Sequence, residues 1–372
     1  MKMKPTTHDP IACTKSVLGL LVILSMTACS TTPRIQSTAS KPQYLYAANA
    51  GSGTISAYRI NAATGALTQV PGSPFDTRTP DKITVNPAGT FAYVLSGGTI
   101  SAYHINAATG MLTPVPGSPF GTGYQGTRIA INPAGTFAYV GSGYSNTVSA
   151  YRINASTGAL ATIPGSPFPV ASAPLSITID PAGSFVYVVS GGQISIFSID
   201  AATGALTPVA GNPFLTGTDA DSITISPDGT FAYMGGRKTI SVYRVDTATG
   251  ALTPVAGSPF PEGNSDFTSV AVNRAGTYAY VTQFYSGVSV YRINRSTGAL
   301  TEIAGSPFNV GGGSTPRSVT LNPAGTFVYQ GGDGKNAVFG SRINPVTGAL
   351  TPIPGSPFAS GANPVSLAIA QP

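Results

Sequence analysis

The sequence predicts an all-β fold, a seven-bladed β-propeller with four-stranded antiparallel blades. Thr-Gly-Ala-Leu or a close variant occurs seven times, with its glycines 45 to 50 residues apart. Such a period is typical of propellers and other repeat folds. Ser-Pro-Phe, once as Asn-Pro-Phe, also occurs seven times. Glycine (45) and proline (32) are abundant at repeating positions, where they suit tight turns. The glycines of the first motif are Gly65, Gly110, Gly158, Gly204, Gly250, Gly298 and Gly348.

Residues 1–28 have the pattern of a lipoprotein-type signal peptide. Three lysines precede a short apolar run over 17–24, and small residues lead to Cys29. The run is too short to span a bilayer, which takes about 20 residues. The segment before Cys29 resembles a bacterial lipobox, in which that cysteine is lipidated. An ordinary signal peptide cleaved near a cysteine is the alternative.

Lipidation would explain why Cys29 is the only cysteine left after processing, because an unpaired cysteine in an oxidising compartment needs an explanation. Residues 29–42 are rich in Ser, Thr and Pro and are predicted to be a flexible tether. No acidic residue directly follows Cys29. By resemblance to known lipoproteins, we expect export and an outer-membrane anchor, with membrane contact only through the lipid on Cys29.

One repeat unit predicts four strands in order. Residues 83–86 form the inner strand, 91–95 the second, 99–105 the third and 112–115 the outer one. Pro, Gly and Asn occupy the turns between them, where they supply the required backbone conformations. Four strands per unit, repeated in a ring, describe a propeller.

The two ends of the chain predict how the ring closes. Residues 43–48 match a second strand of the unit, and residues 364–369 match a first strand. One blade is therefore built from both termini, and the propeller domain spans residues 43–372. Closure of this kind removes the exposed sheet edges that promote aggregation.

Loops divide between two faces, because successive strands run in opposite directions. The turns after the first and third strands are nearly identical in every blade and are predicted to be structural. The repeated arginines at the end of the third strand are predicted to make packing or blade-to-blade contacts. These are Arg59, Arg152, Arg244, Arg292 and Arg342, with His104 in the same position.

The opposite face carries the variable loops, so candidate functional residues are sought there. Just before the inner strand, two neighbouring blades carry Lys82 and Arg128. The other five blades have Ser176, Ser222, Ser269, Ser318 and Ser366. One residue earlier stand Asp81, Asp221 and Arg317, and nearby loops add Tyr124, Glu262 and Asp266.

These residues are predicted to surround the mouth of the central channel. Lys82, Arg128 and Arg317 could hold an anionic group, and Tyr124, Glu262 and Asp266 are further ligand-binding candidates. The alternative is a solvated rim that carries the few charges of the loops.

Several other chemistries are disfavoured. His104 is the only histidine after the signal peptide, which excludes a multi-histidine metal site. Ca²⁺ binding by Asp219, Asp221, Glu262 and Asp266 stays conceivable but lacks EF-hand spacing, so no metal or cofactor is expected. Removing Lys2, Lys4, Lys15 and Asp9 lowers the net charge from +6 to +4, and this scattered excess predicts no nucleic acid binding.

The repeated segments resemble the seven-bladed lactonase-type propellers. The resemblance rests on Tyr-Val-x-Ser after Gly-Thr-Phe-Ala, on Ser-Ala-Tyr-Arg-Ile-Asn and on Thr-Gly-Ala-Leu-Thr, over about residues 43–372. Tyr280-Val-Thr-Gln283 is also similar to YVTN-type surface propellers. The resemblance implies the fold and a link to 6-phosphogluconolactonases and carboxymuconate-cyclising enzymes, which belong to that family. It transfers no catalytic residue, because the His and Glu used by cyclising members have no motif match here.

Two functions follow as hypotheses. The first is a non-catalytic binding module in the cell envelope, with an envelope protein or glycan as partner. The second is hydrolysis of an extracytoplasmic lactone: Lys82, Arg128 and Arg317 would stabilise the oxyanion, and Asp81 or Asp221 would activate water. A closed pocket with converging carboxylate and arginine would favour the enzyme, whereas a shallow apolar or aromatic rim would favour the binding module.

Overall fold

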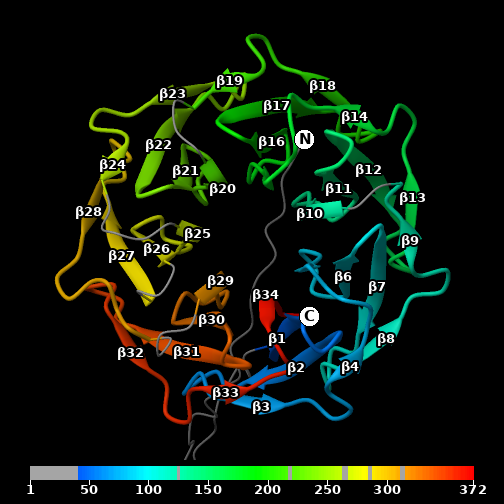
Figure 1. Cartoon of the computed structure of the whole chain (residues 1–372), viewed down its shortest axis with the longest axis vertical. Helices are drawn as coiled ribbons and strands as arrows, with labels where there is room; N and C mark the ends of the chain where they lie inside the picture. The colour runs from blue at the N-terminus through cyan, green and yellow to red at the C-terminus, as the bar shows by residue number, and fades with distance from the viewer. Residues whose placement is uncertain (1–40, 124–125, 217–219, 262–266, 284–286, 311–314) are drawn as a thin grey trace, which may run out of the picture. The chain divides into compact units, whose positions relative to one another are not determined.

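The computed structural model describes residues 41–123, 126–216, 220–261, 267–283, 287–310 and 315–372. Within them the chain forms seven antiparallel sheets and no helix, which confirms the all-β prediction. Figure 1 shows the sheets as blades arranged in a ring. The N-terminal segment lies outside the described residues, and so do Cys29 and the part of the predicted tether up to residue 40.

Each blade begins with an inner strand beside the channel, and each inner strand contacts its two neighbours around the ring. These strands are β34 (Pro364–Ala370), β5 (Lys82–Val85), β10 (Gly126–Ile131), β15 (Ser176–Ile179), β20 (Ala220–Ile225), β25 (Phe267–Val272) and β29 (Thr315–Leu321).

The second and third strands form the centre of each blade. The second strands are β1 (Gln43–Asn49), β6 (Phe91–Ser96), β11 (Phe137–Ser142), β16 (Phe185–Ser190), β21 (Phe231–Gly236), β26 (Tyr278–Gln283) and β30 (Phe327–Asp333). The third strands are β2 (Thr54–Ile60), β7 (Thr99–Ile105), β12 (Thr147–Ile153), β17 (Gln193–Ile199), β22 (Thr239–Val245), β27 (Gly287–Ile293) and β31 (Ala337–Ile343).

Three-residue outer strands complete the four-stranded plan at the periphery of the ring (Figure 1). They are β3 (Leu67–Gln69), β8 (Leu112–Pro114), β13 (Leu160–Thr162), β18 (Leu206–Pro208), β23 (Leu252–Pro254), β28 (Leu300–Glu302) and β32 (Leu350–Pro352).

Six blades also carry a fifth, two-residue strand that the sequence did not predict. It contains the Phe of the Ser-Pro-Phe motif and pairs with the beginning of the third strand. The motif serine explains the pairing, because its hydroxyl accepts a hydrogen bond from a third-strand amide, as Ser118 does from Ala102 at 2.8 Å. Asn212 does the same through its side-chain oxygen. The short strands are β4 (Phe75–Asp76), β9 (Phe120–Gly121), β14 (Phe168–Pro169), β19 (Phe214–Leu215), β24 (Phe260–Pro261) and β33 (Phe358–Ala359).

The predicted closure is confirmed. β1 pairs with β2 on one side and with β34 on the other, so one sheet contains both ends of the described fold. Figure 1 shows the blue N-terminal strands and red β34 side by side. β1 is therefore paired along both of its edges, and the join between the two ends of the fold leaves no unpaired edge on this strand.

The Thr-Gly-Ala-Leu turns join neighbouring blades. Gly110 in the turn after β7 has φ +76°, and a Cβ there would lie 2.3 Å from Cδ1 of Tyr44 in the preceding blade. The hydroxyl of Tyr46 donates to the carbonyl of the same glycine at 2.8 Å. Glycine is therefore required twice over, by its backbone conformation and by the close approach of an aromatic ring.

The repeated arginines also make blade-to-blade contacts, as predicted. Arg152 stacks on the ring of Phe137, with 4.8 Å between the guanidinium carbon and the ring centroid. Its Nη2 atom donates at 2.7 Å to the carbonyl of Ala202 in the next blade. Arg244 and Arg342 repeat both contacts. These side chains thus have packing roles on the face that carries the identical turns.

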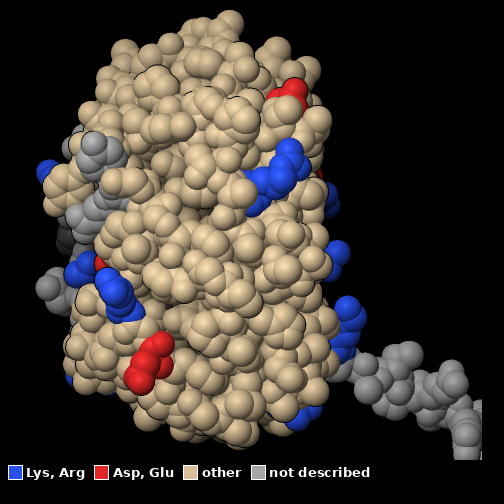
Figure 2. All heavy atoms as spheres, turned by 90° about the vertical axis from the view of Figure 1, so that its right-hand side faces the viewer, with Lys and Arg blue, Asp and Glu red and all other residues tan. Residues whose placement is uncertain are grey.

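The core lies between adjacent blades rather than at one centre. Seven hydrophobic clusters each combine side chains from neighbouring sheets. Charged side chains are sparse on the side of the surface shown in Figure 2. Of the described residues, none belongs to a helix long and apolar enough to cross a membrane.

Candidate functional site

Two adjoining cavities occupy the mouth of the central channel, each with a volume of about 240 Å³. Lys82, Arg128 and Arg317 line both cavities. The inner cavity continues along the inner strands past Ile83 and Thr84, whereas the outer one is lined by earlier residues such as Asp81. The three cations therefore stand at the junction between an inner and an outer chamber.

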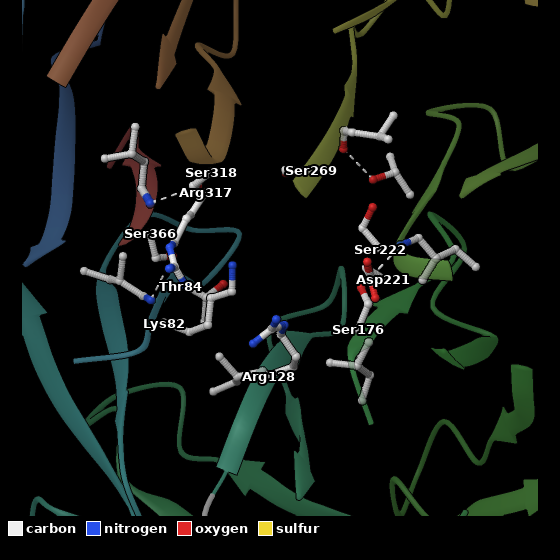
Figure 3. Close-up of a pocket in the computed structure, with 17 residues that line it drawn as sticks. Lys82, Thr84, Arg128, Ser176, Asp221, Ser222, Ser269, Arg317, Ser318 and Ser366 are labelled. Carbon is white, nitrogen blue, oxygen red and sulfur yellow. Dashed lines mark hydrogen bonds between the residues drawn. The ribbon is translucent and has the colours of Figure 1, made fainter. Parts of the chain in front are cut away.

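Figure 3 shows how the inner chamber is divided. Lys82 and Arg317 lie on one side, and Asp221 lies on the other among serines from the neighbouring blades. Arg128 projects into the space between them. The polar side chains that line this chamber are Lys82, Thr84, Arg128, Ser176, Asp221, Ser222, Thr224, Ser269, Arg317, Ser318 and Ser366.

Three serines of this ring connect blades, whereas the buried hydroxyl of Ser222 has no hydrogen-bond partner among the described residues. The hydroxyl of Ser366 accepts a hydrogen bond from the amide of Ile83 at 3.3 Å, across to the next inner strand. Ser176 accepts from Ile223 in the same way, and Ser318 accepts from Leu367. Lys82 and Arg128 hold the equivalent positions in their blades. Neither side chain can accept a hydrogen bond, so both positions give up this contact.

Arg128 is bonded to its own strand and lies near two carboxylates. Its Nη1 atom donates to the carbonyl of Thr127 at 2.8 Å. Burial lowers the pKa of its guanidinium, and the nearby carboxylates of Asp81 and Asp221 oppose that change. The guanidinium stays charged at any physiological pH. Arg128 is therefore a fixed positive charge near both candidate bases.

Lys82 has the most altered chemistry in the site. Burial of its ammonium lowers its pKa to about 7, and the positive charge of Arg128 contributes in the same direction. An ordinary lysine has a pKa near 10.4. At neutral pH this side chain is therefore a mixture of ammonium and free amine.

The structure brings together Asp81, Lys82, Arg128, Asp221 and Arg317, while Tyr124, Glu262 and Asp266 lie outside the described residues. Sequence reasoning missed Thr84 and Thr224, which also line the inner chamber. They could have been found from strand periodicity, because residues two apart on a strand share a face.

No group of three or more His, Cys, Asp or Glu side chains that could hold a metal ion occurs within the described ranges. Of the four carboxylates considered for Ca²⁺, only Asp221 falls in those ranges.

The model of the family described as "Lactonase, 7-bladed beta-propeller" matches residues 35–124, 115–218, 211–307 and 256–367. None of the curated proteins matches the chain.

Solved structures share the fold at low identity. A candidate 6-phosphogluconolactonase from Bacteroides fragilis is 19% identical, with a TM-score of 0.78 over 90% of this chain and 99% of that one. One from Bacteroides uniformis is 17% identical, with a TM-score of 0.76 over 89% and 100%. The periplasmic gluconolactonase PpgL of Pseudomonas aeruginosa is 17% identical, with a TM-score of 0.73 over 89% and 100%.

Proposed function

Because the chain belongs to the family of seven-bladed β-propeller lactonases, we propose that it hydrolyses a lactone in the inner chamber of the channel mouth. The observation that carries the proposal is the convergence of Arg128, Lys82 and Asp221 on one small polar cavity. This is the arrangement that distinguishes an enzyme from a broad binding surface. A volume of about 240 Å³ suits a single small ring compound better than a drug-sized ligand.

The reaction needs a base, an oxyanion site and a route for the leaving oxygen. Asp221 takes a proton from water, whose oxygen attacks the lactone carbonyl carbon. The carbonyl electrons move to oxygen, and Arg128 stabilises the resulting oxyanion together with Lys82 or Arg317. Collapse of the tetrahedral intermediate breaks the ring C–O bond, and the departing oxygen takes up the proton. The product is the open hydroxy acid.

Asp221 is preferred over Asp81 as the base because it lines the inner chamber. There the hydroxyls of Thr84, Thr224 and the serines can hold the polar substituents of a ring. Asp81 lines the outer chamber, so we place it at the entrance to the site and not in the role of the base. The variants Asp221→Asn and Asp81→Asn separate the two roles.

Hydrolysis of several lactones by the purified protein is the test, measured against the spontaneous rate in buffer. The expected result is saturable turnover that falls by about 10²-fold or more in Arg128→Ala, as for the loss of one oxyanion donor. The triple variant of Lys82, Arg128 and Arg317 to Ala should lose turnover completely, while Lys335→Ala, an exposed lysine outside both cavities, should keep it. If no lactone is hydrolysed faster with the protein than spontaneously in buffer, the proposal is wrong.

We also propose that the chain is exported and lipidated at Cys29. The described fold begins at β1, and Gln43 is paired with Ile60 at the face of the identical turns. An anchor attached ahead of Gln43 would therefore join the propeller at the face opposite the chamber mouth. Mass spectrometry of the membrane fraction should find a diacylglyceryl group on Cys29, and Cys29→Ser should release the protein into the soluble fraction. Soluble wild-type protein with a free Cys29 thiol would contradict lipidation.

A further inference from the structure

Lys82 occupies a position that the fold uses elsewhere to connect blades. In three other blades a serine hydroxyl at this point accepts a hydrogen bond from the next inner strand, as Ser366 does from Ile83. A lysine at this position gives up that contact and places a long cationic side chain in the channel. A residue that breaks a repeat at the cost of a structural bond calls for a functional reason.

The surroundings of Lys82 suit capture of a small anion. The side chain lies at the junction of the two chambers, and Arg128 and Arg317 line both chambers beside it. The charged groups that face this junction are Asp81 from its own blade, Arg128, Asp221 and Arg317. Two guanidinium groups can bind a carboxylate, and the carboxylates of Asp81 and Asp221 can exchange protons with a reacting group nearby.

The amine of Lys82 is also available as a nucleophile at neutral pH. Its pKa of about 7 follows first from burial and second from the charge of Arg128. Only the free amine attacks a carbonyl, and lysines that form Schiff bases are made reactive by desolvation or by a neighbouring cation. Lys82 combines both conditions.

We propose that Lys82 forms an imine with small aldehydes or ketones that carry a carboxylate, which Arg128 and Arg317 hold beside the amine. The Nζ lone pair attacks the carbonyl carbon, and the carbonyl oxygen takes up a proton to give a carbinolamine. Loss of that oxygen as water, with one further proton, leaves the protonated C=N bond. No oxidant or reductant is needed. This activity does not depend on lactone hydrolysis.

Reductive trapping tests the proposal. The purified protein is incubated with glyoxylate and sodium cyanoborohydride, which converts an imine into a stable carboxymethyl-lysine. Peptide mass mapping then compares Lys82 with Lys238 and Lys335, which are exposed in the same molecule. The expected result is one carboxymethyl group per chain, on Lys82, with half-maximal labelling near pH 7. Lys238 and Lys335 should label appreciably only at much higher pH.

Two variants complete the test. Lys82→Arg keeps the positive charge and should abolish the single adduct, while Arg128→Gln should lose the preference for glyoxylate over uncharged acetaldehyde yet still label at Lys82. Equal labelling of Lys82, Lys238 and Lys335 at pH 7 would overturn the proposal. So would an unchanged adduct in Lys82→Arg. Because trapping uses no lactone, its outcome is separate from that of the hydrolysis assay.

Discussion

The hydroxyl of Tyr187 in one blade donates a hydrogen bond of 3.1 Å to the carbonyl oxygen of Gly250 in the next blade. Tyr46, Tyr93 and Tyr139 make the same contact. Tyr329 makes it to Gly65, across the seam between the last and first blades. The ring is therefore held by a repeated bond between buried groups. Tyr233 holds the equivalent position, but its buried hydroxyl has no hydrogen-bond partner among the described residues.

This difference gives a matched pair of variants. Tyr187→Phe should lower the free energy of unfolding by about 1–2 kcal/mol, because it leaves the buried Gly250 carbonyl without its partner. Tyr233→Phe should change it by less than about 0.5 kcal/mol, because no bond is lost. Urea titration followed by tyrosine fluorescence would measure both. Equal losses in the two variants would show that the hydrogen bond is not the cause.

The turn glycines give a second prediction. Gly110→Ala should destabilise the fold by roughly 2–4 kcal/mol, because the new Cβ would meet the ring of Tyr44 at 2.3 Å and the backbone would be strained as well. Gly97→Ala is the control, since Gly97 also has a positive φ (57°) but nothing lies within 4 Å of its Cβ position. It should cost about 1 kcal/mol from strain alone. Thermal unfolding of the two variants separates the effect of crowding from that of backbone strain.

Replacing Lys82 by serine, the residue that five other blades carry at this position, should stabilise the fold and abolish imine formation. In Lys82→Ser the new hydroxyl can accept a hydrogen bond from the next inner strand, as Ser366 does from Ile83, and no buried ammonium remains. We expect a gain of about 1 kcal/mol or more, together with loss of the glyoxylate adduct. Lys335→Ser, which removes an exposed lysine, should neither raise the stability nor remove the glyoxylate adduct. A less stable Lys82→Ser protein would show that a serine at this position does not stabilise the contact between inner strands.

The pH dependence of stability follows from the same lysine. The pKa of Lys82 is about 7 in the folded protein and about 10.4 in the unfolded chain. Between these values the unfolded chain binds more protons, so the stability of the wild type rises with pH; below about pH 7 the full cost of the buried charge is present.

Lys82→Met removes this cost at every pH. It should therefore be more stable than the wild type at pH 7, with a difference that shrinks towards pH 10. Melting temperatures measured at both pH values for wild type, Lys82→Met and the control Lys335→Met would check this. A difference that stays constant with pH would mean that Lys82 titrates normally in the folded protein.

The number of blades, their strand order and the closure through both termini were all predictable from the repeated motifs. This was possible because each motif reports a local backbone requirement. Gly110 must adopt a positive φ, and a side-chain oxygen at the position of Ser118 or Asn212 must accept a third-strand amide. Such requirements recur in every blade, so seven copies of one pattern are enough to predict the ring.

Periodicity and the break in the repeat also located Lys82, Arg128 and Asp221 near the channel mouth. Their chemistry was decided only by the tertiary structure. The pKa of Lys82 depends on burial by side chains from other blades and on its proximity to Arg128. The two carboxylates that face Arg128 come from residues 81 and 221, far apart in the chain. Desolvation and through-space charge depend on distances across the ring, and a linear pattern does not contain those distances.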